Sequence, residues 1–403
     1  MDNVFYCFGH HMKQQLFLIL LFIISAWSCS SQKEIELPEE FQELKNLIVH
    51  SGDTQPTLEI RFEREQSFSS TNEVLIGDMS AAPAVDDRGR VFIADRIQNT
   101  IHVFSPDGCH LTKLGREGRG PGEYGNIRSL HIRNDRLYVY DPGQYKIDIF
   151  TLDTLEIEKA ISLAGNRGEY QSLNNTYPWI HKIFVRNNGT YFAQFIAHSS
   201  TPNKKWQNVD MKGFLYPLDS AGKITSRILI EFKEEICTYI YGLLSRKPFF
   251  ENARTVLSSD DTIYLAGPAY FLIKEYSPEG DYRQAFYYPV KKIPLTQESA
   301  VEAGAHDYYI QNMELMDLPP TWPVLTEMII DDQDRLWIAT TVEDMNIFEW
   351  WVLEKTGELI TRFKWPRDGA IQVVRGDYIY TRDTDPDTDI QQIVRYRIAL
   401  EEI

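Results

Sequence analysis

Three histidines, His131, His181 and His198, are the residues whose chemistry would most change what this chain does. A catalytic zinc ion needs three protein ligands and one open coordination position, and neutral imidazole is one of its common ligands. The three histidines are scattered along the chain and follow no metal-binding spacing. Two interpretations therefore stay open, a zinc site and three partly buried structural histidines.

A glycine-rich segment offers a second kind of site. Residues 115–122 read Gly-Arg-Glu-Gly-Arg-Gly-Pro-Gly, and the backbone amides of such a turn, with Arg116 and Arg119, can cradle an anion. The segment lacks the spacing and the following helix of a P-loop or a dinucleotide-binding fingerprint. A connecting turn is the alternative interpretation.

An acidic segment near the C-terminus is the third candidate. Residues 383–389 place four aspartates at alternate positions, and carboxylate oxygens are the donors that Ca²⁺ prefers. Against a calcium loop, the sixth position is not glycine and the twelfth is Val394 rather than glutamate. A solvated acidic loop is the alternative, and the common hydrolase, redox and nucleotide-binding motifs are absent from the sequence.

The N-terminal residues predict the cellular location of the protein. Residues 16–26 form an uncharged apolar run, shorter than the roughly 20 residues that span a bilayer, and fit the core of a secretory signal. Ala26 and Ser28 precede Cys29 in a pattern that resembles the lipobox of bacterial lipoproteins, although Trp27 is bulky for it. An ordinary cleaved signal is the alternative.

The lipobox resemblance implies lipidation of Cys29 and an outer-membrane lipoprotein facing the periplasm or the cell surface. We expect a signal peptide over 1–28, a polar tether over 29–56 and a folded domain over 57–403. Contact with the membrane is then expected only through the lipid anchor.

Composition limits the classes of partner. The 403 residues include 41 Lys and Arg against 58 Asp and Glu, a net charge of −17, with 43% hydrophobic residues. The hydrophobic fraction is that of a globular protein, and the acidic balance gives no reason to bind nucleic acid. Four cysteines in a chain of this length do not indicate a disulfide framework.

A repeated pattern dominates the rest of the chain. An apolar strand, a polar turn, a strand centred on an aromatic residue and two further strands recur six times. The aromatic positions are Phe92, Tyr138, Tyr191, Tyr264, Trp337 and Tyr380. Each unit alternates apolar and polar residues at the strand period, and units of this kind pack radially as propeller blades.

The repeats predict an all-β fold, a six-bladed β-propeller of four-stranded blades. The sixth repeat lacks its last strand, and the alternating segment 57–64 is expected to supply it and close the ring. We also expect a short helical insertion before blade five, from Thr296 to about Met313. A seven-bladed ring or two separate sandwiches are the alternatives.

Two stretches carry a family resemblance. Residues 89–95 read Gly-Arg-Val-Phe-Ile-Ala-Asp, and with 99–104 and Pro106-Asp107-Gly108 they resemble an NHL repeat. With the lipobox, the chain looks like a bacterial six-bladed β-propeller lipoprotein of the NHL-repeat type, most clearly in the first two blades. The resemblance implies a scaffold and no particular chemistry.

The functional hypothesis rests on three long loops, 194–212, 233–252 and 289–324, which the blade assignment places on one face. We expect a binding or scaffolding module rather than an enzyme, one that holds a protein, peptide or glycan at this face and needs no cofactor. Its expected ligand-binding residues are Arg116, Arg119, Arg128, Trp179, Trp206, Arg246, Tyr270 and Trp322. The alternative is a metal-dependent propeller enzyme, a lyase or lactonase-like hydrolase with zinc or calcium.

Overall fold

The computed structural model describes residues 37–71, 74–79, 81–166, 179–198, 207–240, 243–246, 249 and 252–403. For residues 198, 207–208, 235–240 and 243–246 only the backbone is described. The chain divides into two compact units, Met1–Glu43 and Leu44–Ile403. In the first unit, the described residues form one 3-10 turn, Glu39–Phe41.

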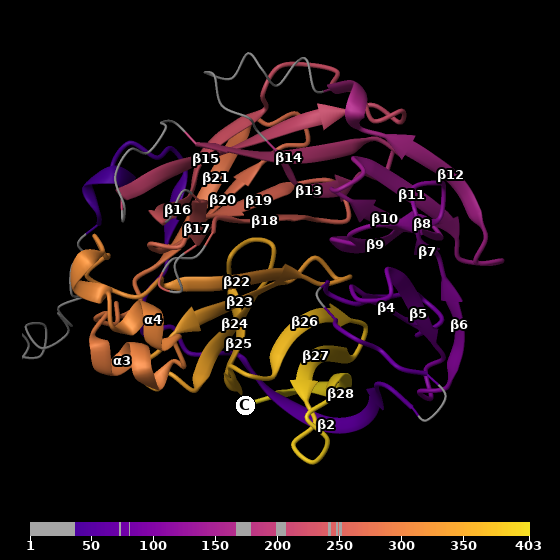
Figure 1. The fold of residues 1–403 in the computed structure, drawn as a ribbon. Coiled ribbons are helices and arrows are strands. Elements are labelled where there is room, and N and C mark those ends of the chain that lie inside the picture. Colours follow the sequence, from indigo (N-terminus) through magenta and orange to yellow (C-terminus); the bar gives the residue numbers. More distant parts are fainter. Residues whose placement is uncertain are drawn as a thin grey trace, which may run out of the picture. The chain divides into compact units, whose positions relative to one another are not determined.

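The second unit is built from six blades arranged around a central axis, each a sheet of four or five strands (Figure 1). All blade strands pair antiparallel except β1, and the separate strands β7 (Arg116–Glu117) and β8 (Glu123–Tyr124) form a small parallel sheet. Blade one contains β3 (Ala84–Val85), β4 (Val91–Asp95), β5 (Thr100–Phe104) and β6 (His110–Leu114). Blade two contains β9 (Ser129–Arg133), β10 (Arg136–Asp141), β11 (Lys146–Thr151) and β12 (Ile157–Ser162). Blade three contains β13 (Trp179–Val185), β14 (Tyr191–His198), β15 (Gln207–Leu218), β16 (Ile230–Ile240) and β17 (Leu243–Arg246).

The other three blades follow the same order from the axis outward. Blade four contains β18 (Arg254–Leu257), β19 (Ile263–Ala266), β20 (Phe271–Tyr276), β21 (Tyr282–Tyr288) and β1 (Leu47–Val49). Blade five contains β22 (Leu325–Ile330), β23 (Leu336–Thr341), β24 (Ile347–Leu353) and β25 (Leu359–Pro366). Blade six contains β26 (Ala370–Arg375), β27 (Tyr378–Thr384), β28 (Gln391–Glu402) and β2 (Leu58–Phe68).

The predicted ring closure is confirmed. Strand β2 pairs antiparallel with β28 from Leu58 opposite Glu402 to Phe68 opposite Ile393, so the indigo and yellow ends of the domain share one blade (Figure 1). The expected tether, 29–56, needs one correction. Its residues 47–49 form β1, which pairs in parallel with the outer strand β21 and hides an otherwise open sheet edge.

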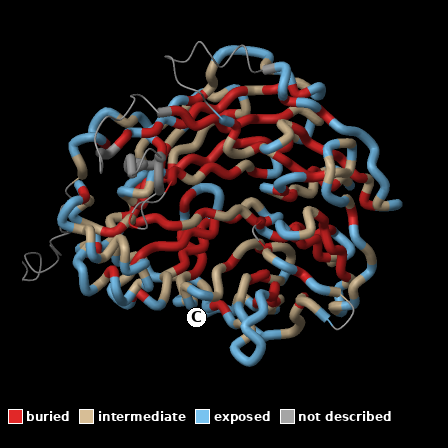
Figure 2. Tube along the Cα trace, viewed as in Figure 1, coloured by how far each residue is buried: buried red, intermediate tan, exposed pale blue. Residues whose placement is uncertain are grey.

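Apolar side chains fill the spaces between blades. Each pair of neighbouring blades shares a hydrophobic cluster, including the pair formed by blades six and one, where Phe68 of β2 packs with Tyr380 and Phe104. All six aromatic positions of the repeat are buried, and buried residues follow the strands throughout (Figure 2). The repeat therefore encodes the blade-to-blade contact.

The turn between the first two strands is built alike in blades one and five. Asp331 accepts the N–H of Arg335 at 2.9 Å and its guanidinium Nε–H at 2.6 Å. Asp86 does the same with Arg90, at 2.8 and 2.7 Å. A carboxylate four residues before an arginine thus ties each turn to itself, so the first strands are held in place at this end.

The helical insertion before blade five is confirmed. Helix α3 (Gln297–Glu302) follows an N-cap at Thr296, and α4 (Asp307–Ile310) follows an N-cap at His306, so the expected segment forms two short helices. They belong to a small core with Phe249 from the blade three–four connection and Met345 from the β23–β24 connection. Residues from two of the three expected loop segments therefore meet in this core. The expectation of long loops is wrong for most of 194–212 and 233–252, because the strands of blade three, β14 to β17, extend into both segments. No helix in the described part of the chain is long and apolar enough to cross a membrane.

Candidate functional site

The first strands of the six blades surround a cavity of about 410 Å³ on the propeller axis. First strands are paired on one side only, so their other edge and alternate side chains face the axis. The cavity is lined by residues Ala82–Pro83, Arg128–Arg133, Lys182, Phe184–Val185, Val256–Leu257, Glu327–Ile330 and Ile371–Val374. Its size is that of a small-molecule site, and most of the lining is apolar.

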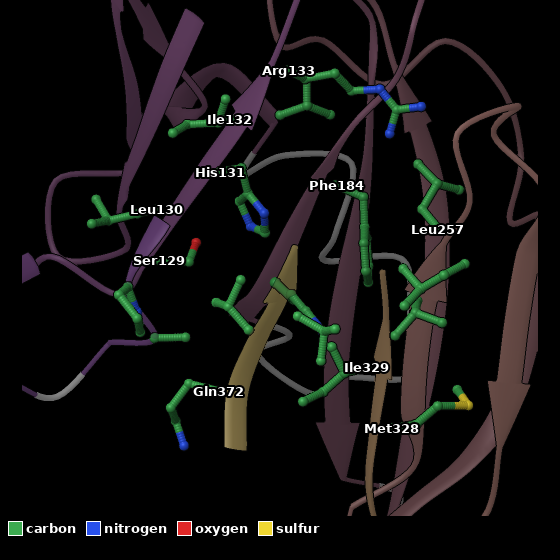
Figure 3. Close-up of a pocket in the computed structure, with 18 of the residues that line it drawn as sticks. Ser129, Leu130, His131, Ile132, Arg133, Phe184, Leu257, Met328, Ile329 and Gln372 are labelled. Carbon is green, nitrogen blue, oxygen red and sulfur yellow. The ribbon is translucent and has the colours of Figure 1, made fainter. Parts of the chain in front are cut away.

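Strand β9 contributes two polar side chains to the lining. Ser129 and His131 are two residues apart, so their side chains leave the same face of the strand. Figure 3 shows both on one side of the cavity, with Phe184 and Ile329 across from them. Ser129 Oγ and His131 Nε2 are each buried and have no hydrogen-bond partner among the described residues. A buried polar atom without a partner is uncommon and needs an explanation.

Lys182 of the neighbouring blade adds an ammonium group. Its Nζ donates to the carbonyl oxygen of Thr255 at 3.1 Å and lies 4.9 Å from the centre of the Phe184 ring. No carboxylate of the described residues lies within ion-pair distance of this ammonium group, so part of its donor capacity is unused. Hydroxyl, imidazole and ammonium groups thus line a mostly apolar cavity, the first two on β9 and the ammonium group beside Phe184.

Burial sets the protonation of these groups. It lowers the pKa of His131 to about 4, and the positive charges of Lys182 and Arg133 add to the effect, so the imidazole is neutral at pH 7. Burial also lowers the pKa of Lys182, against the opposing influence of Glu327. The charge of Lys182 therefore disfavours protonation of His131 across the cavity.

The carboxylate of the cavity wall, Glu327, is paired with protein donors. Arg254 Nε lies 3.2 Å from Glu327 Oε1 and donates to the carbonyl oxygen of Thr326 at 3.0 Å. The same Glu327 oxygen accepts the N–H of Met328 at 3.0 Å. The Glu327 carboxylate is thus engaged by protein donors.

The turns between first and second strands lie at the end of the axis opposite the helical insertion, and their side chains connect different blades. Arg133 of blade two forms an ion pair with Asp261 of blade four at 3.0 Å, and Nε of the same arginine donates to Asn187 of blade three. Asn187 in turn donates its N–H to Asp261 at 3.0 Å. These contacts link three blades, so this end is structural, and the loop-rich face is the expected entrance.

The glycine-rich segment does not present an open anion site. The Glu123 carboxylate accepts the N–H groups of Arg119 and Gly120 at 3.0 and 2.9 Å and the guanidinium of Arg116 at 2.6 Å. These donors lower the pKa of Glu123 to about 2. The predicted cradle exists, but the chain fills it with its own carboxylate. Arg116 and Arg119 therefore stabilise the turn between blades one and two.

The other expected ligand-binding residues are dispersed. Arg128 is exposed and lines the cavity, and Trp179 is exposed at the start of β13. Tyr270 is half-buried, with Nζ of Lys292 3.6 Å from its ring centre. Trp206, the Arg246 side chain and Cys29 lie outside what the structure describes. Of the expected ligand-binding residues whose side chains the structure describes, Arg128 alone lines the cavity.

Trp322 is a correction to the sequence-based expectation. It is 6% exposed, and its indole N–H donates to Ser299 Oγ at 2.9 Å, within the helical insertion. Its own N–H binds the carbonyl oxygen of Ile293 at 2.8 Å, which folds the proline-rich segment back over the helices. Trp322 is thus a packing residue of the insertion.

The candidate metal ligands form no donor cluster among the described residues, and the side chain of His198 lies outside them. Asp385 accepts the N–H groups of Asp387 and Thr388 at 2.9 and 3.1 Å, a local turn. Burial raises the pKa of Asp383, which accepts a hydrogen bond from Tyr396 at 3.4 Å. Among the described residues, no three His, Cys, Asp or Glu side chains are placed to hold one metal ion.

Sequence analysis identified His131 as a candidate zinc ligand, but it did not identify Ser129, Lys182 or Glu327 as candidate site residues. Each lies on a first strand that reads as an ordinary alternating segment. A polar residue at an axis-facing position of such a strand is the only signal that marks them, and the exact register must be known to use it.

Comparisons with known proteins support the fold. The model of a family described as 6-bladed beta-propeller (DUF5128) matches residues 67–167. The solved structure of a duf4221 family member from Bacteroides vulgatus ATCC 8482 has a TM-score of 0.53 and 10% identity, over 86% of this chain and 100% of that chain. None of the curated proteins matches.

Two further solved structures are more distant. A Bacteroides fragilis NCTC 9343 protein is 12% identical, with a TM-score of 0.45 over 88% of this chain and 99% of its own. A catalytically inactive virginiamycin B lyase from Staphylococcus aureus, with quinupristin, is 14% identical, with a TM-score of 0.41 over 84% of this chain and 99% of its own. At these identities the likeness concerns the fold alone.

Proposed function

We propose that the protein is a binding module of the bacterial cell envelope, anchored by lipid at Cys29, whose ligand enters the axial cavity from the loop-rich face. The ligand is a protein, a peptide or a glycan that places one of its groups in the cavity. The observation that carries the proposal is the cavity itself: about 410 Å³, largely apolar, with buried polar atoms left without partners on one side.

The rigidity of the scaffold supports the proposal. The cavity wall comes from every blade, and each blade is locked to its neighbours by a shared apolar cluster. A preformed wall of this kind loses little conformational entropy when a ligand is bound. The lipobox resemblance around Cys29 supports the envelope location and the outer-membrane anchor.

The proposal is tested by substitutions that place larger side chains in the cavity. The purified full chain is screened on peptide and glycan arrays, and every hit is measured by calorimetry. Ser129→Trp and Val373→Phe enlarge side chains on two different walls, whereas Leu111→Trp places the same indole ring on the exposed outer strand β6. We expect both cavity variants to lose binding at least tenfold and Leu111→Trp to keep it.

Melting temperatures of the three variants separate lost binding from lost folding. Hits that bind the folded cavity variants as tightly as the unmodified chain would contradict the proposal, as would arrays without any hit.

A further inference from the structure

Three polar residues of the cavity lining, Ser129 and His131 on β9 and Lys182 on β13, are called the polar region here. Their side chains share one property, because each of them can donate hydrogen bonds. Lys182 is a donor only, and the Ser129 hydroxyl and the neutral His131 ring can each donate. Ser129 Oγ and His131 Nε2 have no partner in the described structure, and the described partner of Lys182 Nζ is one carbonyl oxygen, that of Thr255.

A carboxylate matches this region. Its two oxygens accept up to four hydrogen bonds, and bonds from an ammonium group are stronger than those between neutral groups. A cationic group would meet the Lys182 ammonium instead. Glu327, the acidic residue of the lining, is already held by Arg254 and by the N–H of Met328.

The charges behind the region do not cancel this preference. Glu234 is buried and accepts a hydrogen bond from Gln194 at 3.3 Å, and its effect on Lys182 is smaller than those of Glu327 and Arg254. No ion pair joins it to Lys182 within the described residues.

The rest of the wall determines the body of the ligand. Phe184 faces His131 across the cavity, and Val256, Met328 and Ile329 continue the apolar lining (Figure 3). Burial of apolar surface against these side chains favours a hydrophobic ligand body. A strongly hydrated sugar ring would gain less binding free energy from this apolar wall, because it has less apolar surface to bury.

We infer that the axial cavity binds a monocarboxylate with an apolar body, whose carboxylate accepts hydrogen bonds from Lys182, His131 and Ser129. The inference rests on the proposed function, binding in this cavity, and narrows its ligand chemistry. Two sources carry such a group, a free carboxylic acid and the C-terminal residue of a peptide.

The experiment compares acids with their neutral counterparts on the full chain. Calorimetric titrations use 4-phenylbutyrate against 4-phenylbutanamide, and N-acetylphenylalanine against its amide. We expect the acid of at least one pair to bind about tenfold more tightly, the usual scale for a hydrogen bond to a charged group. Preference in the first pair alone identifies a free acid, and preference in the second identifies a peptide terminus.

Variants assign the preference to residues. Lys182→Met keeps the length of the side chain and removes the charge, so acid and amide should bind within about twofold of each other. Lys212→Met, an exposed lysine paired with Glu231 in the same blade, is the matched control. Ser129→Ala tests a second contact should Lys182→Met fail to fold.

Equal binding of acids and amides, both lost in Ser129→Trp, would overturn the carboxylate assignment and leave the binding role intact. An acid preference that survives Lys182→Met and Ser129→Ala would overturn it as well. Absence of binding by every acid at about 10 mM would also overturn the carboxylate assignment, because titration at this concentration detects dissociation constants in the millimolar range. Ordered water alone would then occupy the polar region.

Discussion

The carboxylate of Glu123 accepts a hydrogen bond from the N–H of Gly120 at 2.9 Å, inside the turn that joins blades one and two. The turn has the backbone geometry of an anion site, and an acid three residues further along the chain occupies it. The same carboxylate holds the N–H of Arg119 and the side chain of Arg116. An anion cradle and its anion are therefore encoded in one short segment.

Removing that carboxylate should turn the structural turn into an anion site. We expect Glu123→Ala to lower the melting temperature, because the amides of Arg119 and Gly120 lose their acceptor. Added sulfate should raise the melting temperature of the variant more than that of the unmodified protein. Thermal unfolding with and without sulfate measures this, and equal effects on both proteins would argue against a cradle.

Acid should destabilise the protein through His131. Its pKa is about 4 in the folded protein against 6.5 for a free imidazole, so the unfolded chain binds the proton more tightly. Stability is therefore lost as the pH falls from about 6.5 towards 4, by an amount on the order of 3 kcal/mol. Urea unfolding at several pH values should show a shallower decline for His131→Gln. His102, whose pKa is also lowered to about 4 by burial, contributes equally to both proteins and cancels in the comparison.

Ring closure by β2 should contribute strongly to stability. Ile60 of this strand is buried among side chains of blades five and six. Ile60→Ala should lower the free energy of unfolding by about 2–4 kcal/mol, the usual cost of such a truncation. Glu59→Ala, on the exposed face of the same strand, should change it little. Similar unfolding midpoints for the two variants would contradict a closing role.

Lipid attachment should depend on Cys29. We expect the full chain to partition with membranes in its bacterial host and to incorporate an alkyne-labelled fatty acid. Cys29→Ser should abolish both, because a single thiol receives the diacylglycerol in the lipoprotein pattern. Unchanged fractionation and labelling of Cys29→Ser would favour an ordinary cleaved signal.

Metal analysis addresses the alternative function. A binding module without a metal should contain no stoichiometric zinc or calcium when purified without chelators, and chelation should leave its melting temperature unchanged. About one ion per chain by elemental analysis, lost together with stability on chelation, would favour the metal-dependent enzyme.

The class of fold was predictable from local patterns. The apolar alternation and the aromatic residue of each repeat act through strand pairing and burial, which depend on sequence period more than on distant residues. The same holds for the closing strand, because a repeat that lacks its fourth strand leaves an unpaired sheet edge that another segment must cover. Thr296 as the helix N-cap was equally readable, since capping is a local interaction.

The site was predictable only in fragments. Arg128 and His131 were recognised as functional candidates, and both line the cavity. The alternatives for the glycine-rich segment could not be separated by sequence, because a nearby glutamate is a ligand for the turn only if the chain bends back to it. Trp322 looked like a surface aromatic, and only the packing of the helical insertion buries it.

The sequence by itself determined the blades, their number and the closure of the ring, because these follow from short-range alternation repeated along the chain. Tertiary structure alone decided which polar side chains meet. Ser129, Lys182 and Glu327 come from three different blades. Their shared cavity depends on strand register and on the radial order of the blades, and a shift of one residue would turn each side chain away from the axis.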